Sequence, residues 1–137
     1  NKFVAGFIGS PPMNFLEAAV EADGSNIYVN EGSFRLKVTA EQKKMLTPYV
    51  GKSVTFGIRP EDVTFSNTPK DGETIDGTVS VVEPLGSETH VFVSTSRSQV
   101  VGKIEPNLVP APDTKISLIP DMVKAKFFDL ETEQVIK

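Results

Sequence analysis

His90 is the only histidine of the chain, so any catalytic triad or histidine-ligated metal would have to use it. General acid–base chemistry there would need a carboxylate or hydroxyl partner, and Glu88 and Ser94 are near it in the sequence. In the alternating segment around it, however, Val91 and Val93 occupy the opposite face, which is typical of a half-buried strand. We therefore expect His90 to be a surface or interface side chain with no catalytic role.

Three acidic residues near the C-terminus, Asp129, Glu131 and Glu133, lie two positions apart. On an extended segment their carboxylates would share one side and attract a hard cation such as calcium. The glycine that a calcium-binding loop needs at its sharp turn is missing. We therefore expect a solvated acidic turn here, and no metal-binding residue in the chain.

Other classes of chemistry lack their defining residues. Neither a glycine-rich phosphate loop ending in Lys-Ser/Thr nor the spaced glycines of a dinucleotide site occurs. The absence of cysteine excludes disulfides, thiolate metal sites and cysteine nucleophiles. A net charge of −4, with Lys and Arg scattered, argues against nucleic-acid binding. We predict that the chain has no catalytic or cofactor-binding residue and is not an enzyme.

Short alternating segments dominate the rest of the sequence. Gly, Pro, Asn and Ser separate them at a spacing of roughly 8–12 residues, which is typical of barrels and sandwiches. The expected strands are 27–29, 34–38, 54–58, 75–82, 89–94, 99–104 and 115–119. We predict an all-β fold of one small closed barrel, in which the polar loop 66–72 marks a boundary between two possible sub-lobes.

Two short helices are expected beside the strands. Thr39 and Gln42 form a capping-box pattern that opens a helix of about two turns, which Pro48 ends. Apolar residues between positions 3 and 8 recur at three- and four-residue intervals, as on one side of a short N-terminal helix. The segments 57–63 and 117–123 also echo each other, as two similar strand exits would.

Four stretches occur in one order: 3–15 (FVAGFIGSPPMNF), 56–63 (FGIRPEDV), 82–89 (VEPLGSET) and 127–129 (FFD). Together they resemble the region that follows the nucleotide-binding domain in ATPases of maltose-type sugar ABC importers. The resemblance spans nearly the whole chain. It implies that residues 1–14 are a lead-in from an ATPase domain that is missing here. Residues 15–137 would then be a transport-associated, OB-type regulatory and dimerisation domain.

The resemblance also implies partners. ATP and magnesium would bind the parent chain, before Asn1, and no cofactor would bind this part. Two such domains would hold the ATPase halves together as a homodimer on the cytoplasmic side of the membrane, where permease subunits bind the ATPase domains. In some relatives, inhibitory regulatory proteins bind the domain. Relatives carry a proline and a glycine where this chain has Leu130 and Glu133, so we expect a different last turn.

Candidate interface residues follow from their positions in these motifs. They are Ser10, Pro11, Met13, Asn14, Arg59, Glu61, Glu83, Gly86 and Glu88. Structural turns explain the same residues equally well, because Pro and Gly at strand ends need no partner. An alternative function is the capture of a small oxyanion or sugar by backbone donors, as related transport-associated barrels bind molybdate.

Overall fold

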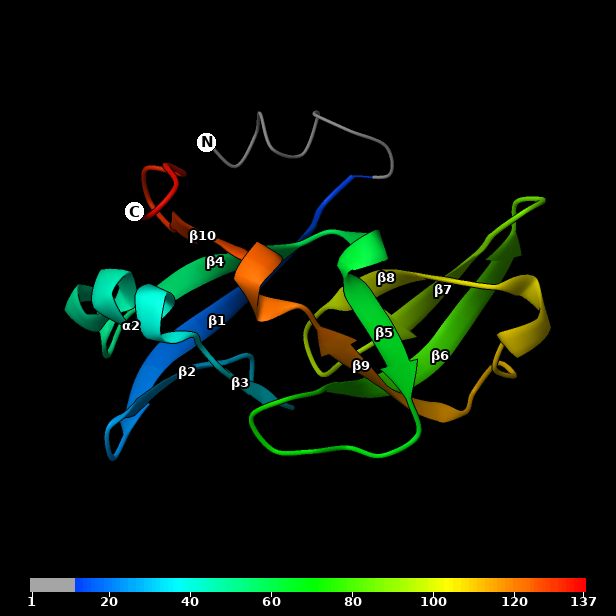
Figure 1. The fold of residues 1–137 in the computed structure, drawn as a ribbon, viewed down its shortest axis with the longest axis horizontal. Helices are drawn as coiled ribbons and strands as arrows, with labels where there is room; N and C mark the ends of the chain where they lie inside the picture. Colours follow the sequence, from blue (N-terminus) through cyan, green and yellow to red (C-terminus); the bar gives the residue numbers. More distant parts are fainter. Residues whose placement is uncertain (1–11) are drawn as a thin grey trace.

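Residues 12–137, which the computed structural model describes, form two curled, five-stranded sheets (Figure 1). The first sheet has the order β10-β4-β1-β2-β3 and the second the order β5-β9-β6-β7-β8, and neighbouring strands are antiparallel. The strands are β1 (Asn14–Asp23), β2 (Asn26–Asn30), β3 (Arg35–Lys37), β4 (Ser53–Ile58), β5 (Val63–Ser66), β6 (Ile75–Pro84), β7 (Thr89–Ser94), β8 (Gln99–Ile104), β9 (Lys115–Pro120) and β10 (Lys126–Asp129). The predicted all-β, barrel-like fold is confirmed.

Each expected strand is present, but the sequence reading missed β1, β5 and β10. The longest of these, β1, alternates buried Leu16, Ala18 and Val20 with outward-facing residues. Its Glu and Ala residues are weak strand formers, so local preference does not predict a strand there. Pairing with β2 on one side and β4 on the other holds β1 in the sheet.

The helix α2 (Ala40–Leu46) is confirmed, together with its capping box. The Gln42 amide donates to the Thr39 hydroxyl at 3.2 Å, and the Thr39 amide donates to the Gln42 side chain at 3.0 Å. A 3-10 turn, η1 (Thr47–Tyr49), containing Pro48, ends the helix as expected. The helix expected between residues 3 and 8 lies outside the described residues.

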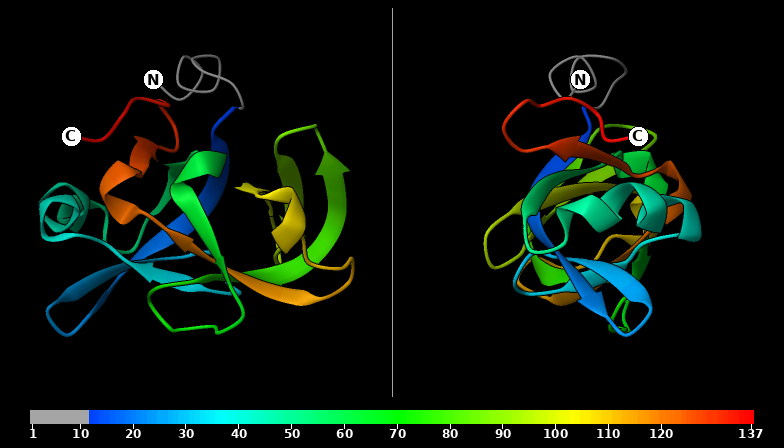
Figure 2. Two further views of the ribbon diagram at one scale, coloured as in Figure 1. Left: turned by 45° about the vertical axis from the view of Figure 1, so that its right-hand side comes forward. Right: turned by 90° about the vertical axis from the view of Figure 1, so that its left-hand side faces the viewer.

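Two segments cross from one sheet to the other side by side. One runs from β4 through the 3-10 turn η2 (Pro60–Asp62) into β5, and the other from β9 through η4 (Met122–Lys124) into β10. Because β4 pairs with β10 and β5 with β9, the two crossings stay in contact. The Asp121 amide donates to the Asp62 carbonyl at 2.8 Å between them. The green and orange segments in Figure 2 follow this path.

This crossing explains the echo between 57–63 and 117–123, since both are strand exits that lead into a 3-10 turn. It also corrects the predicted boundary between sub-lobes. The polar loop 66–72 joins β5 to β6, which belong to the same sheet. The chain changes sheet at Arg59–Asp62 instead, because Pro60 cannot donate to a ladder and so ends β4.

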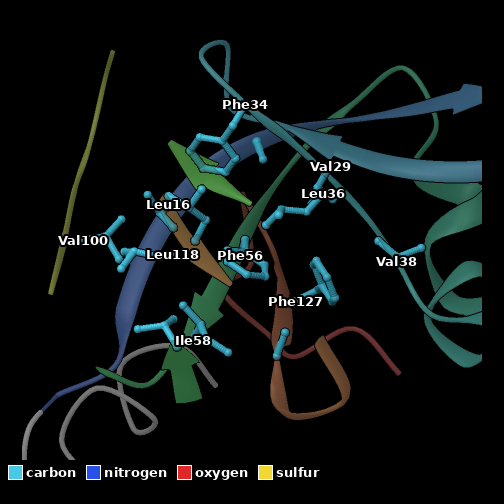
Figure 3. Packing of buried hydrophobic residues seen from close by; sticks show 14 of the residues in the cluster. Leu16, Val29, Phe34, Leu36, Val38, Phe56, Ile58, Val100, Leu118 and Phe127 are labelled. Carbon is cyan, nitrogen blue, oxygen red and sulfur yellow. The ribbon is translucent and has the colours of Figure 1, made fainter. Parts of the chain in front are cut away.

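One continuous hydrophobic core fills the space between the two sheets. Phe56 and Phe127 pack ring against ring at 5.6 Å, and Leu118 and Val100 come from the second sheet (Figure 3). Each of these side chains is at most 1% exposed. Phe34 and Phe128 are buried as well, so these aromatic residues contribute to core packing.

Gly77 marks a close approach between strands in the second sheet. A Cβ atom at this position would press against the Ser94 carbonyl oxygen and lie 2.7 Å from the Val93 side chain. Because the Ser94 oxygen belongs to the backbone, the strand itself would have to move. A glycine is therefore required where β6 enters its hairpin with β7.

We expect Gly77→Ala to lower the free energy of unfolding by about 1–3 kcal/mol, the usual cost of overpacking a filled interior. Glu83→Ala on the same strand is the matched control, because Glu83 is exposed. Urea denaturation at neutral pH measures both variants. Equal stability of the two would show that β6 and β7 have room to separate.

Candidate interaction surface

The acidic turn after β10 uses Asp129 as a structural acceptor. Its carboxylate accepts a hydrogen bond from the Tyr49 hydroxyl at 2.9 Å and from the amides of Glu131 and Thr132 at 3.0 Å. The bonds from the Thr132 amide and the Tyr49 hydroxyl hold the pKa of Asp129 below its usual value. Among residues 12–137, no group of three or more His, Asp or Glu side chains is placed to hold a metal.

Glu31 is the most deeply buried charged side chain that the structure describes, with 0% of its surface exposed. Its carboxylate accepts hydrogen bonds from the hydroxyls of Thr95, Ser33 at 2.8 Å and Ser96 at 3.1 Å. Arg97 donates from Nε to the Glu31 carbonyl at 2.8 Å. Burial alone would raise the pKa of Glu31, but the bonds from Thr95 and Ser33 outweigh it and lower the pKa from 4.5 to about 2.

The position of Glu31 makes these bonds a link between the sheets. Glu31 lies in the turn between β2 and β3, and two of its donors, Thr95 and Ser96, lie in the turn between β7 and β8. The two turns are more than sixty residues apart in the chain. The sequence reading missed this contact, because an acidic residue beside a glycine reads as a solvated turn.

Asn14 makes a second link of the same kind. Its side-chain amide donates to the Val101 carbonyl at 2.9 Å and accepts from the Val101 amide at 2.9 Å, as a neighbouring strand would. Met13 packs beside Gly57, where an added Cβ would lie 2.6 Å from the Met13 sulfur. The structure therefore places two of the predicted interface residues, Met13 and Asn14, in the interior, at 8% and 7% exposure.

The other predicted interface residues fall in two places. Arg59 and Glu61 flank Pro60 at the crossing, where Arg59 is half-buried and Glu61 is exposed. Glu83, Gly86 and Glu88 gather at the projecting tip of the β6–β7 hairpin. The structure thus does not bring all of them together, and Ser10 and Pro11 lie outside the described residues.

The hairpin tip is a tight turn with a small charged cluster beside it. Gly86 has a φ of +85°, which favours glycine, and the Leu85 amide donates to the Glu88 carbonyl at 2.9 Å. The Glu88 carboxylate lies 3.4 Å from Lys103 Nζ and 3.9 Å from His90 Nε2. His90 lies on the face of β7 opposite to the buried Val91 and Val93, as predicted. Its side chain is only 14% exposed, because the neighbouring strands β6 and β8 flank it.

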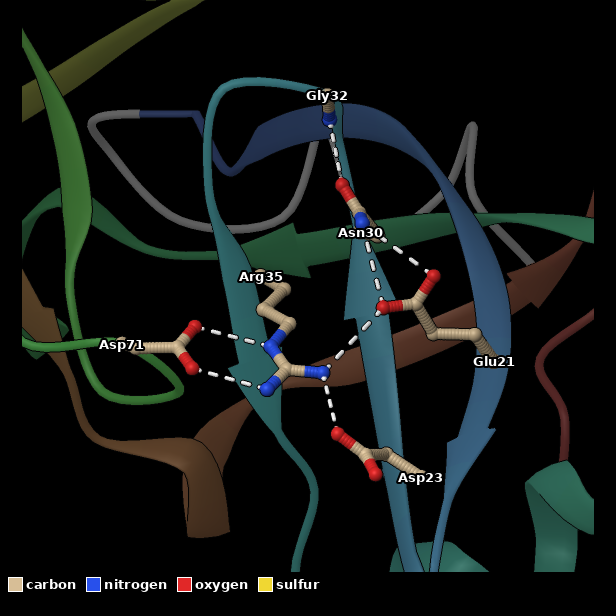
Figure 4. Close-up of polar contacts among 6 residues, drawn as sticks. All are labelled: Glu21, Asp23, Asn30, Gly32, Arg35 and Asp71. Carbon is tan, nitrogen blue, oxygen red and sulfur yellow. Dashed lines mark hydrogen bonds and ion pairs between the residues drawn. The ribbon is translucent and has the colours of Figure 1, made fainter.

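Arg35 ties the long polar loop to the first sheet (Figure 4). Its guanidinium donates two bonds of 2.9 Å to Asp71 and one of 3.0 Å to Asp23, and it lies 3.9 Å from the centre of the Tyr28 ring. Asp71 is not placed to bind a ligand, because Arg35 donates a hydrogen bond to each of its carboxylate oxygens. The cluster holds the 66–72 loop in place and presents no open site.

A large hollow on the surface of the described part is a groove of about 1120 Å³ between α2, β10 and the C-terminal residues. Most of its lining is apolar: Met13, Ala40, Met45, Val123, Ala125, Phe127, Phe128, Val135 and Ile136. Arg59 also lines it, so the groove contains two predicted interface residues, Met13 and Arg59. The groove could not be predicted from the sequence, because its walls come from five separate stretches of the chain, at 13, 39–45, 59, 123–128 and 135–137.

The described residues contain no helix that is long and apolar enough to cross a membrane.

Two family models match overlapping parts of the chain. Residues 9–63 match the MalK OB fold domain and residues 56–122 match the TOBE domain. The two matches meet near the crossing at Arg59–Asp62, where the chain passes from the first sheet to the second. The chain therefore belongs to the family of MalK-type OB fold and TOBE domains.

The curated relatives that the chain matches are ATP-binding proteins of sugar importers. The chain is 41% identical over 142 residues to the trehalose/maltose import ATP-binding protein MalK of Thermococcus litoralis. It is 38% identical over 142 residues to the multiple sugar-binding transport ATP-binding protein MsmK of Streptococcus mutans. These matches cover 99% and 100% of the chain but only 37% of each relative. The resemblance to ATP-binding proteins of sugar importers, predicted from the sequence, is thus confirmed.

A solved structure supports the fold. The cytoplasmic molybdate-binding protein ModG, with molybdate bound, aligns with a TM-score of 0.61 over 88% of this chain and 97% of its own. The sequences are 14% identical, so the likeness concerns the fold alone.

We expect Glu31→Gln to lower the free energy of unfolding at pH 7 by roughly 1–3 kcal/mol, because a neutral amide cannot accept all the bonds that the carboxylate accepts. A lowered pKa contributes stability above about pH 4.5 that is lost as the pH falls toward about 2. The difference between the wild-type chain and Glu31→Gln should therefore shrink over this range.

Urea denaturation from pH 7 down to pH 2 measures this difference. Glu131→Gln is the matched control, because Glu131 is exposed and its substitution should leave the stability unchanged. A pH-independent difference between Glu31→Gln and the wild-type chain would contradict the role assigned to the buried carboxylate.

Proposed function

We propose that this domain holds together two ATP-binding subunits of a carbohydrate ABC importer and is the place where their activity is regulated. The proposal depends on one observation: nearly the whole chain matches sugar-import ATP-binding proteins, and the match covers 37% of the length of each of these two relatives. ATP and magnesium would bind the remaining part of the parent chain. The permease subunits would contact that part too, on the cytoplasmic side of the membrane.

Tethering is a physically reasonable role for a stable barrel outside the catalytic centre. Two ATPase halves must separate after hydrolysis without dissociating. A second contact between the subunits keeps their effective concentration for each other near the millimolar range. A regulatory protein that bound one arrangement of the tethered pair better than the other would shift the equilibrium by that difference in affinity.

The projecting β6–β7 hairpin is the best-placed surface for contact between two copies. It carries three of the predicted interface residues, Glu83, Gly86 and Glu88, and Leu85 at its tip is 49% exposed. A two-fold symmetric interface uses the same patch on both copies. An exposed leucine between charged residues fits the apolar centre and polar rim of such an interface.

Oxyanion or sugar capture by the barrel has weaker support. The likeness to ModG is one of fold, and the groove between α2 and β10 is lined mostly by apolar side chains. Calorimetry with molybdate, sulfate and a panel of sugars separates this alternative from tethering. Capture of a small molecule would give a heat of binding, whereas tethering alone predicts none with these compounds.

We expect removal of residues 15–137 from the full ATP-binding subunit to weaken its dimerisation at least about tenfold, which corresponds to about 1.4 kcal/mol. Sedimentation velocity over a range of concentrations, without nucleotide, measures the dissociation constant. Leu85→Asp in the full subunit should weaken dimerisation in the same direction. Leu130→Asp is the matched control, because Leu130 is 41% exposed and follows β10 of the first sheet, whereas the hairpin belongs to the second.

An unchanged dissociation constant after removal of the domain would rule out tethering. Equal effects of Leu85→Asp and Leu130→Asp would show that the hairpin tip is not the contact surface.

A further inference from the structure

The groove between α2, β10 and the C-terminal residues exposes several apolar side chains. Its rim includes Val123, which is 79% exposed and is the most exposed large apolar residue that the structure describes. Val135 and Met45 lie in the same lining and are only partly buried. Apolar surface gathered in a hollow of this kind marks a place where another apolar group binds.

The size and lining of the groove favour a peptide segment over a small molecule. Small-ligand pockets usually have volumes of about 300–1,000 Å³ and a few convergent polar groups. This groove has a volume of about 1120 Å³. One of its polar groups, the Gln42 side chain, already donates to the Met122 carbonyl at 2.5 Å. The groove therefore fits several large apolar side chains better than one polar ligand.

The chain itself enters the domain at this groove. Met13, the first buried residue of the described part, is one of its lining residues. Residues 3–12 directly before it contain no charged side chain. They include four large apolar residues, Phe3, Val4, Phe7 and Ile8, whose three- and four-residue spacing gives a helix one apolar side.

We propose that the apolar side chains of residues 3–8 occupy this groove. Phe7 is six residues before Met13. A helical connection, at a rise of 1.5 Å per residue, would place Phe7 only about 9 Å along the chain from Met13, which lines the groove. The short connection gives these residues an effective concentration that a separate molecule would not reach. The segment itself brings no charge into the groove, because it carries none between positions 3 and 12.

Such docking has a mechanical consequence. A chain segment fixed along α2 and β10 sets the direction in which the barrel joins whatever precedes residue 3. The barrel would then turn together with that part, and movement in one would be transmitted to the other. A free linker at the same place would transmit none of it.

Methyl-detected NMR of the 137-residue chain tests the proposal. We expect nuclear Overhauser contacts from the ring protons of Phe3 or Phe7 to the methyl groups of Val123, Val135 or Ile136. Phe7→Asp should remove the contacts made by Phe7 and shift the three groove methyl signals. Ser10→Asp is the matched control, because it adds the same charge at a polar position, and it should shift none of them.

Signals of Leu118 in the core serve as the check that each variant is folded. Resolved groove methyl signals without any contact to Phe3 or Phe7 would overturn the proposal. Groove signals that move with protein concentration would overturn it too, because they would assign the groove to a second copy of the chain.

Discussion

The pair of segments that crosses from one sheet to the other is the feature on which the rest of the structure depends. Each sheet alone exposes one apolar face, and a five-stranded sheet with one uncovered face is not stable in water. Because β4–β5 and β9–β10 cross together, the two sheets continue into each other and close over one core. Pro60 is well suited to the crossing, since it cannot donate to a ladder and so ends β4 where the direction changes.

Two polar side chains close the barrel away from the crossing. Asn14 pairs with the backbone of Val101 on β8, and Glu31 holds the β7–β8 turn against the β2–β3 turn. Both side chains are almost fully buried, and their hydrogen bonds replace the water that they lose on folding. Asn14, which the sequence motifs suggest as an interface residue, therefore stabilises the domain itself.

Most strands and the helix α2 can be predicted from local sequence patterns, but the contacts and the groove formed by distant segments cannot. Alternation predicts β7 and β8, and the Thr39–Gln42 capping box predicts α2, because these signals arise from neighbouring residues. The strand β1 escapes, since only pairing with β2 and β4 favours it. Glu31 and the apolar groove escape for the same reason: their contacts join segments that are distant in the chain.

These features describe one cooperative domain, which is what a tether between two ATPase subunits requires. Native-state hydrogen exchange tests this claim most directly. The account predicts that the slowest amides of both sheets, at Phe56 and Phe127 in the first and at Val91 and Leu118 in the second, exchange through one global opening with the same denaturant dependence. A separate opening of the first sheet at a lower free energy would contradict it, because the crossing segments would then not join the sheets into one unit.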